Sequence, residues 1–200
     1  MGAAGGLPPQ FDPRRRALAG IDVLRHGLPA LPEVLTYEMS IPVAFWTSAA
    51  CAVVLFLHYS RQSGGPADPV VSQVGYYRDG DGWRAHPHWT GHGWSHDPVG
   101  KPDDVRDLGG RAIVASGGSF TDRPRPGRPA ITVTGRVSPA VTAIALVHDG
   151  QEDRRPLRSH FGAWVVCLEP WSPYQVKALD KAGAVIGSVQ GRLALPSRSR

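Results

Sequence analysis

The histidines between residues 86 and 96 are the part of the sequence with the clearest potential for chemistry. Four of the chain's eight histidines, His86, His88, His92 and His96, stand within eleven residues. Imidazole is a common protein ligand for zinc, copper and nickel. If one strand continues through His88, its two-residue period places His86 and His88 on the same face, and a loop could bring His92 or His96 over the same ion. The cluster is therefore a candidate site for a divalent transition metal such as zinc, although its spacing matches no known zinc motif.

Three tryptophans, Trp83, Trp89 and Trp94, are interleaved with these histidines. Indole rings exposed beside polar His and Asp groups would form a platform for a sugar or another planar ligand. In the alternative interpretation, the tryptophans pack on a sheet as core residues. The histidines are then exposed or hydrogen bonded and titrate at about pH 6 to 7. The sequence leaves both interpretations open.

Other catalytic signatures are missing from the sequence. Gly117-Gly118-Ser119-Phe120 lacks the Gly-x-Ser-x-Gly elbow of an acyl-transfer nucleophile. Gly109-Gly110-Arg111 lacks the lysine motif of a phosphate-binding loop. No catalytic residue is assigned on this basis. A metal-dependent enzyme remains an alternative if the histidines hold an ion with a position open to water.

Residues 39–60 contain no Asp, Glu, Lys or Arg, and they admit two structures. The stretch is long enough for a single membrane span, which needs about 20 mostly apolar residues. Pro42, Trp46, Thr47 and Ser48 interrupt its first part, however. The competing interpretation is two buried strands, 41–47 and 52–60, rich in β-branched and aromatic residues. The strand interpretation implies a cytoplasmic protein, and the span implies a single-pass membrane protein.

Composition places the chain among globular proteins, because 42% of its residues are hydrophobic and 20% are charged. Its net charge of +5 is mild and its basic residues are dispersed, so we expect no nucleic-acid partner. Cys51 and Cys167 each stand in an apolar run, which predicts two buried thiols and no disulfide framework. The first residues lack a charged leader followed by an apolar core, so we expect no cleavable secretion signal.

The elements of the first half follow from capping and turn residues. Residues 1–11 are predicted to be a flexible tail. Asp12 and Pro13 begin a helix, and Gly27 stands where a left-handed C-cap would end it. The pairs in Asp79-Gly80-Asp81-Gly82 predict a hairpin between strands at 72–78 and 83–88. A linker rich in proline and arginine is expected at 123–129.

The last third alternates short apolar strands with turn residues, which predicts an antiparallel β-sandwich over residues 130–195 before a basic tail at 196–200. The segments Thr132-Val133-Thr134-Gly135-Arg136-Val137 and Tyr174-Gln175-Val176-Lys177-Ala178-Leu179-Asp180 carry this pattern, together with Ala145-Leu146-Val147-His148-Asp149-Gly150. These segments resemble the small immunoglobulin-like modules of actinobacterial proteins. The resemblance implies a binding or spacer unit without catalytic residues.

We therefore predict a mainly β protein with an N-terminal helix, a β-rich first domain within 12–122 and a C-terminal immunoglobulin-like sandwich. The expected function is that of a non-enzymatic interaction or accessory protein with a protein partner. A membrane-anchored protein that displays a β-domain is the alternative if residues 39–60 span a bilayer.

Overall fold

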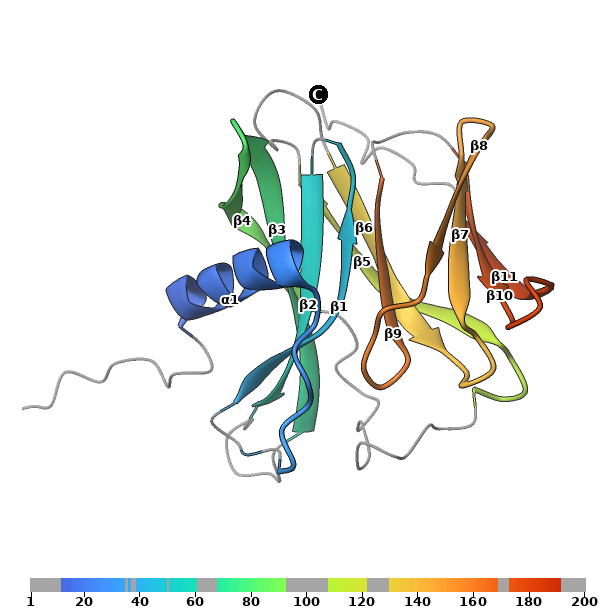
Figure 1. Ribbon diagram of the computed structural model, residues 1–200, viewed down its shortest axis with the longest axis horizontal. Helices are drawn as coiled ribbons and strands as arrows, with labels where there is room; N and C mark the ends of the chain where they lie inside the picture. The colour runs from blue at the N-terminus through green and yellow to red at the C-terminus, as the bar shows by residue number, and fades with distance from the viewer. Residues whose placement is uncertain are drawn as a thin grey trace, which may run out of the picture.

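The computed structural model is mainly β, as the sequence predicts, with a single N-terminal helix and three antiparallel sheets among the residues it describes (Figure 1). The structure describes residues 12–34, 36, 39–49, 51–60, 68–92, 108–121, 130–168 and 173–191. The predicted tails at 1–11 and 196–200 lie outside these residues.

Helix α1 (Pro13–His26) has the ends that the sequence predicts. The Asp12 side chain accepts a hydrogen bond from the Arg14 backbone N–H at 2.9 Å, which satisfies one of the free amides of the first turn. Gly27 has a φ of 89°, and its N–H donates to the Val23 carbonyl at 2.8 Å. A side chain would be strained at that φ, so glycine ends the helix there.

Sheet A consists of β1 (Ser40–Thr47), β2 (Cys51–Ser60), β3 (Asp68–Asp79) and β4 (Gly82–His92) in the order β1-β2-β3-β4. Residues 40–47 and 51–60 therefore form two antiparallel strands, as the strand interpretation of this segment predicts, in place of the alternative single span. No helix within the described residues combines the length and apolar character that crossing a bilayer requires. The β1–β2 connection lacks Gly, Asn and Asp, but Ser48 closes it instead: its Oγ accepts from the Cys51 N–H at 3.1 Å, and its N–H donates to the Cys51 carbonyl at 2.7 Å.

The predicted hairpin between β3 and β4 is confirmed. Arg78 pairs with Trp83 and Asp79 with Gly82, and Gly80 turns the chain at a φ of 58°. Further along, the register shifts: Tyr76 pairs with Ala85, whereas Val74 pairs with Thr90. Residues 86–89 therefore lie in an irregular part of β4.

The remaining strands form two sheets, and one of them, sheet B, combines strands from both predicted domains. Sheet B has the order β5-β6-β9 and sheet C the order β11-β10-β7-β8. The strands are β5 (Ile113–Thr121), β6 (Ala130–Val137), β7 (Ala143–His148), β8 (Gln151–Pro156), β9 (Ala163–Leu168), β10 (Tyr174–Leu179) and β11 (Val185–Gly191). Strand β5 precedes the predicted linker at 123–129, yet it pairs along its length with β6. The predicted boundary therefore falls between two neighbouring strands of one sheet, although residues 122–129 themselves lie outside the described residues.

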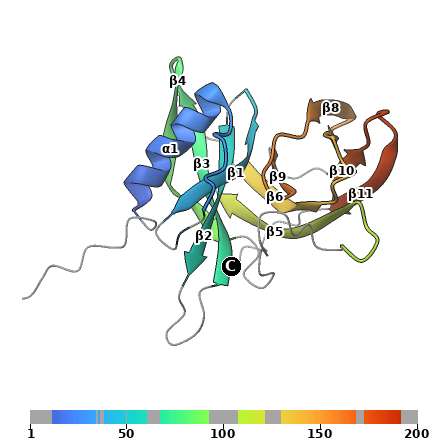
Figure 2. The ribbon, with the colours of Figure 1, turned by 60° about the horizontal axis from the view of Figure 1, so that its bottom comes forward.

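Sheet B lies between sheets A and C, and α1 covers the outer face of sheet A (Figures 1 and 2). Successive residues of β2 point to opposite faces, so this strand belongs to two hydrophobic cores. The inter-sheet core takes alternate residues of β2 from Cys51 to Leu57, with most of β9 and parts of β6, β7 and β10. The helix-side core lies beneath α1 and consists of Val23, Ala52, Val54, Phe56, Val74, Tyr76 and Trp83.

Candidate functional site

Trp83, the first of the predicted platform residues, belongs to the helix-side core. Its side chain is only 8% exposed, and the Arg78 guanidinium carbon lies 4.3 Å from the centre of its ring. This is the core role that the sequence left open beside ligand stacking. The side chain of Trp89 and the whole of Trp94 lie outside the described residues.

The histidine cluster is described only at its first member. His86 is 8% exposed, and its ring meets the edge of Tyr77 with the ring centroids 6.2 Å apart. His88 and His92 lie in β4, but their side chains are outside the described part, as is all of His96. The register shift at residues 86–89 interrupts the two-residue period from which a shared face for His86 and His88 was argued.

No group of three or more His, Cys, Asp or Glu side chains gathers within the described residues in a way that could hold a metal ion. Three of the four predicted ligands fall outside that search. The zinc site at His86, His88, His92 and His96 therefore stays a prediction from the sequence.

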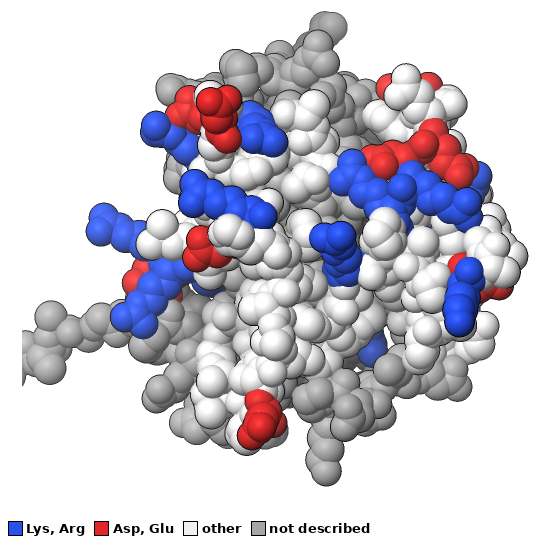
Figure 3. All heavy atoms as spheres, in the orientation of Figure 1, with Lys and Arg blue, Asp and Glu red and all other residues white. Residues whose placement is uncertain are grey.

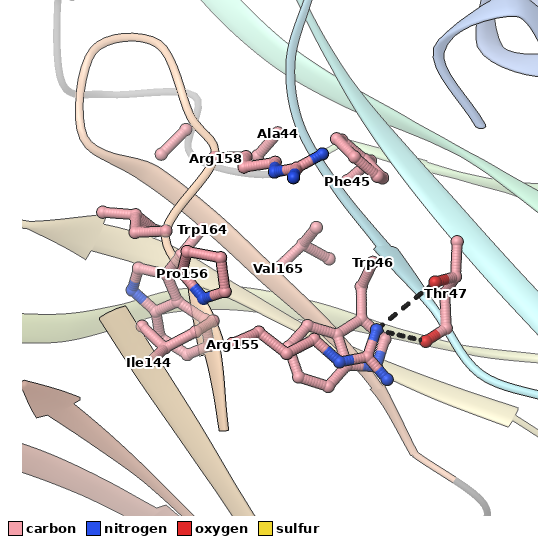
Figure 4. A pocket seen from close by; sticks show the side chains of 12 residues that line it. Ala44, Phe45, Trp46, Thr47, Ile144, Arg155, Pro156, Arg158, Trp164 and Val165 are labelled. Carbon is pink, nitrogen blue, oxygen red and sulfur yellow. Dashed lines mark hydrogen bonds between the residues drawn. The ribbon is translucent and has the colours of Figure 1, made fainter. Parts of the chain in front are cut away.

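A pocket of about 260 Å³ opens where sheets A, B and C meet (Figure 4). Residues 44–47 of β1 and 163–165 of β9 form two of its walls, and Ile144 of β7 and residues 155–158 at the end of β8 complete it. The segment after β8 runs along β1: Ser159 forms a bridge with Ala44, and the His160 N–H donates to the Val43 carbonyl at 2.7 Å. The pocket is thus built where a connection from sheet C crosses the edge of sheet A.

The pocket's interior is largely apolar and carries two tryptophans. Trp46 of β1 and Trp164 of β9 are 4% and 1% exposed, and Val165 lies between their rings in Figure 4. The Trp164 indole N–H donates to the carbonyls of Val114 and Arg136, at 3.1 and 3.3 Å. This ring is therefore fixed by hydrogen bonds as well as by packing, which makes it a rigid wall.

Arg155 lies against one end of the pocket with its donors occupied. Its Nη1 donates to the Thr47 carbonyl at 2.6 Å and lies 3.3 Å from the Thr47 hydroxyl. Its Nε and Nη2 reach the two carboxylate oxygens of Asp153, at 2.9 and 2.5 Å. The guanidinium carbon lies 4.1 Å from the centre of the Trp46 ring, a cation–π arrangement. Arg155 thus ties sheet C to sheet A, and Asp153 neutralises its charge.

Arg158 is the second cation at the pocket, and its situation is different. It is exposed, and it makes no hydrogen bond or ion pair with any residue in the described part of the chain. In Figure 4 its side chain lies beside Ala44 and extends toward Phe45, across the pocket from Ile144. The pocket therefore combines apolar walls with a guanidinium group whose donors are available at its rim.

A second polar cluster lies beneath α1. The Arg16 Nη1 donates to the Ser72 hydroxyl at 2.9 Å, and that hydroxyl lies 3.4 Å from the Nδ1 of His58. A serine beside a histidine is the start of a nucleophile and base pair. Ser72 and His58 are only 3% and 2% exposed, however, so a substrate would not reach the hydroxyl. We interpret this cluster as the polar contact that fixes α1 on sheet A.

Comparisons of the chain with protein-family models, with curated proteins and with solved structures found no match. The function therefore has to be argued from the pocket itself. Sequence reasoning missed this pocket because its residues come from four separate stretches of the chain. The signal for the pocket that the sequence offered was the run Glu152-Asp153-Arg154-Arg155 before Pro156, because it places charges beside an apolar core. Figure 3 shows basic and acidic side chains gathered over β8.

Proposed function

We propose that this chain is a non-enzymatic binding protein whose pocket between β1, β8 and β9 takes an aromatic group with a carboxylate beside it. The observation that carries the proposal is Arg158, an exposed cation without a partner among the described residues at the rim of a pocket walled by tryptophans. Guanidinium groups bind carboxylates through paired hydrogen bonds. The apolar walls would hold the ring of the same ligand.

The size of the pocket sets the size of the aromatic group. An apolar cavity of about 150 Å³ in another protein is large enough to bind benzene. A pocket of about 260 Å³ therefore has room for a ring system as large as indole. The carboxylate would then lie at the rim, where Arg158 can reach it, since the donors of Arg155 are used by Thr47 and Asp153.

The same ligand chemistry occurs in a free aromatic acid and in a protein whose chain ends in an aromatic residue. We favour the protein partner. A chain terminus supplies the ring and the carboxylate together, and the peptide leading to it can lie over the charged surface of β8 (Figure 3). The exposed residues of β8 have both charge signs, which suits a polar rim around a buried anchor.

The strand order supports an immunoglobulin-like module as the scaffold. If β5 to β11 are lettered A, B, C, C′, E, F and G, the sheets become A-B-E and G-F-C-C′. Immunoglobulin domains place A, B and E in one sheet and C, F and G in the other, and C′ joins the second sheet in the variable type. We therefore propose that the module begins at β5, before the linker predicted at 123–129, and serves as a binding unit.

Binding can be tested with three probes of defined chemistry. They are indole-3-acetate, a hexapeptide that ends in tryptophan with a free carboxylate, and the same peptide with an amidated end. We expect the free-acid peptide to shift the indole N–H signals of Trp46 and Trp164 in NMR spectra, and the amidated peptide to bind more weakly. If indole-3-acetate alone binds, the ligand is a small acid instead of a protein.

Arg158→Ala tests the role of the cation, with Arg154→Ala as the matched control. Arg154 is an exposed arginine of β8 that donates to the Gly183 carbonyl at 2.6 Å and does not line the pocket. Hydrogen bonds to charged groups contribute about 1.5–3 kcal/mol, so Arg158→Ala should weaken binding roughly 10- to 100-fold. Arg154→Ala removes only an exposed rim charge, so it should weaken binding by no more than about fivefold. The proposal fails if neither acid binds, or if both variants bind as the unmodified protein does.

A further inference from the structure

The two cysteines of the chain, far apart in the sequence, meet between sheets A and B. Cys51 begins β2 and Cys167 lies in β9, 116 residues further along the chain. Both side chains are 4% exposed, so the predicted burial of the two thiols is confirmed. The packing of the sheets brings their Sγ atoms to 2.7 Å from each other.

This separation is too short for two thiols that only pack together. Carbon atoms in van der Waals contact lie about 3.5–4.0 Å apart, and sulfur is larger than carbon. A small approach of the two side chains would bring the sulfurs to bonding distance. The strands that carry them are both fixed by neighbours, because β2 pairs with β1 and β3 and β9 pairs with β6. The fold therefore holds the two sulfurs together from both sides.

We propose that Cys51 and Cys167 form a disulfide that cross-links sheet A to sheet B when the chain meets an oxidant, and that they are a redox modification site. A low-molecular-weight disulfide is a suitable oxidant. The Cys51 thiolate attacks one of its sulfurs and releases one thiol, and the Cys167 thiolate then attacks the Cys51 sulfur of the mixed disulfide and releases the second. Two cysteine thiols are oxidised, and one external disulfide is reduced to two thiols.

Ser48 favours Cys51 as the attacking group. Its hydroxyl donates to the Cys51 carbonyl at 3.0 Å and lies 3.2 Å from the Cys51 Sγ, so its one proton can turn to the sulfur once that is a thiolate. The same hydroxyl accepts from the Cys51 N–H, so the connection between β1 and β2 holds the two side chains together. The β1 residues Trp46 and Thr47, just before this connection, line the pocket. The disulfide would therefore pin the end of the hairpin that forms one pocket wall.

Burial decides when the bond can form and how long it lasts. With both sulfurs almost fully covered, an external disulfide reaches them only when the sheets separate or before they have packed. The bond is therefore expected to form during folding in an oxidising solution. Once formed, the same burial should protect it from reductants.

The test is to refold the full chain with oxidised or with reduced glutathione and to count thiols in denaturant. The chain has only two cysteines, so any disulfide within a monomer joins Cys51 to Cys167. We expect the oxidised product to be monomeric, lighter by two hydrogen atoms and without reactive thiols. Because the bond closes a loop of more than 100 residues, it should raise the melting temperature by on the order of 10 °C.

Cys51→Ser and Cys167→Ser are the controls, and each should melt at the same temperature whether refolded with oxidised or with reduced glutathione. The proposal is overturned if the oxidised chain retains both thiols or pairs only between molecules. It is also overturned if the monomeric disulfide melts no higher than the reduced chain, since the bond would then not fit the native packing.

Discussion

The two faces of sheet A are packed in different ways. One face meets sheet B in the inter-sheet core. There, the strands on both sides are held by hydrogen bonds to neighbouring strands of their own sheet. The other face is covered, among the described residues, by α1 and by Leu28 just after it, in the helix-side core. The same strand, β2, supplies both cores with alternate residues, so the difference comes from the partner and not from β2 itself.

The polar contacts of the two interfaces differ as well. In the inter-sheet region, the buried Thr132 hydroxyl donates to the Gln73 Oε1 at 2.8 Å and joins β6 to β3. Beneath α1, the Tyr76 hydroxyl donates to the Arg16 carbonyl at 3.3 Å, and the Arg16 side chain reaches Ser72. These polar contacts of the helix thus reach a single strand, β3, while its apolar side chains pack on β2, β3 and β4. We infer that the helix-side interface can adjust to a change and the inter-sheet one cannot.

Gly135→Ala is the change that should cost the most, because it adds a methyl group within the inter-sheet region. A Cβ at Gly135 would lie 1.9 Å from the Val114 carbonyl oxygen and 2.7 Å from the Trp164 Nε1. The first atom belongs to the backbone of β5, and the second is held by two hydrogen bonds, so neither can move aside cheaply. We expect the free energy of unfolding to fall by about 3 kcal/mol or more, measured by urea denaturation.

Gly82→Ala is the matched control for this substitution. Gly82 begins β4, and a Cβ there would meet only the Asp79 carbonyl at 3.7 Å, an ordinary contact. We expect its stability to stay within about 0.5 kcal/mol of the unmodified protein. A Gly135→Ala protein as stable as the Gly82→Ala protein would show that β5 and β6 can separate, contrary to the rigidity inferred for this region.

Gly20→Ala makes the same chemical change in the helix-side core and should cost less. The added Cβ would lie 1.7 Å from the Tyr76 hydroxyl oxygen and 2.5 Å from the ring carbon that bears it. These atoms end a side chain, and α1 can shift on the sheet. Overpacking costs about 1–3 kcal/mol, and replacing glycine within a helix returns up to about 1 kcal/mol. We therefore expect a net loss of about 1–2 kcal/mol in the same denaturation experiment.

A double mutant decides whether Tyr76 is the cause of that loss. Tyr76→Phe removes the atom nearest to the added methyl group, so Gly20→Ala should cost less in the Tyr76→Phe background than in the unmodified protein. Equal costs in the two backgrounds would place the strain elsewhere in α1.

The contrast between the interfaces also explains what the sequence could predict. The helix and the β3–β4 hairpin were predictable because their signals are local, as with Asp12 and Gly27 at the helix ends. Strand β8 was missed because Gln151–Pro156 is a charged edge strand without an apolar face. The pairing of β5 with β6 and the pocket around Trp164 depend on contacts between distant segments, which no local pattern records.

The metal and platform predictions show the same limit. They treated residues 83–96 as a regular strand followed by a loop. The register shift at 86–89 depends on how β4 pairs with β3, and the burial of Trp83 depends on α1. Neither feature can be read from the spacing of histidines and tryptophans.

Tyr76→Phe alone should have the smallest effect at neutral pH and a distinctive effect in alkaline solution. Loss of the hydrogen bond to the Arg16 carbonyl should cost about 1 kcal/mol. Burial raises the pKa of Tyr76 well above its ordinary value of 10.0, against the opposing charge of Arg16. The unfolded chain therefore loses this proton first as the pH rises past about 10, so the unmodified protein should lose stability from there upward. The Tyr76→Phe protein lacks this group and should lose less.

Tyr174→Phe is the control for this pH dependence. Burial also raises the pKa of Tyr174, but this residue lies in sheet C, away from α1. The free energy of unfolding is measured in urea at pH 8 and at pH 11. The difference in this free energy between the unmodified and Tyr76→Phe proteins should be smaller at pH 11 than at pH 8. The difference for the Tyr174→Phe protein should change less between the two pH values, because Tyr76 is the more deeply buried of the two rings. If the difference for Tyr76→Phe were the same at both pH values, water would have to reach the Tyr76 hydroxyl beneath α1. The helix-side interface would then be looser than its packing indicates.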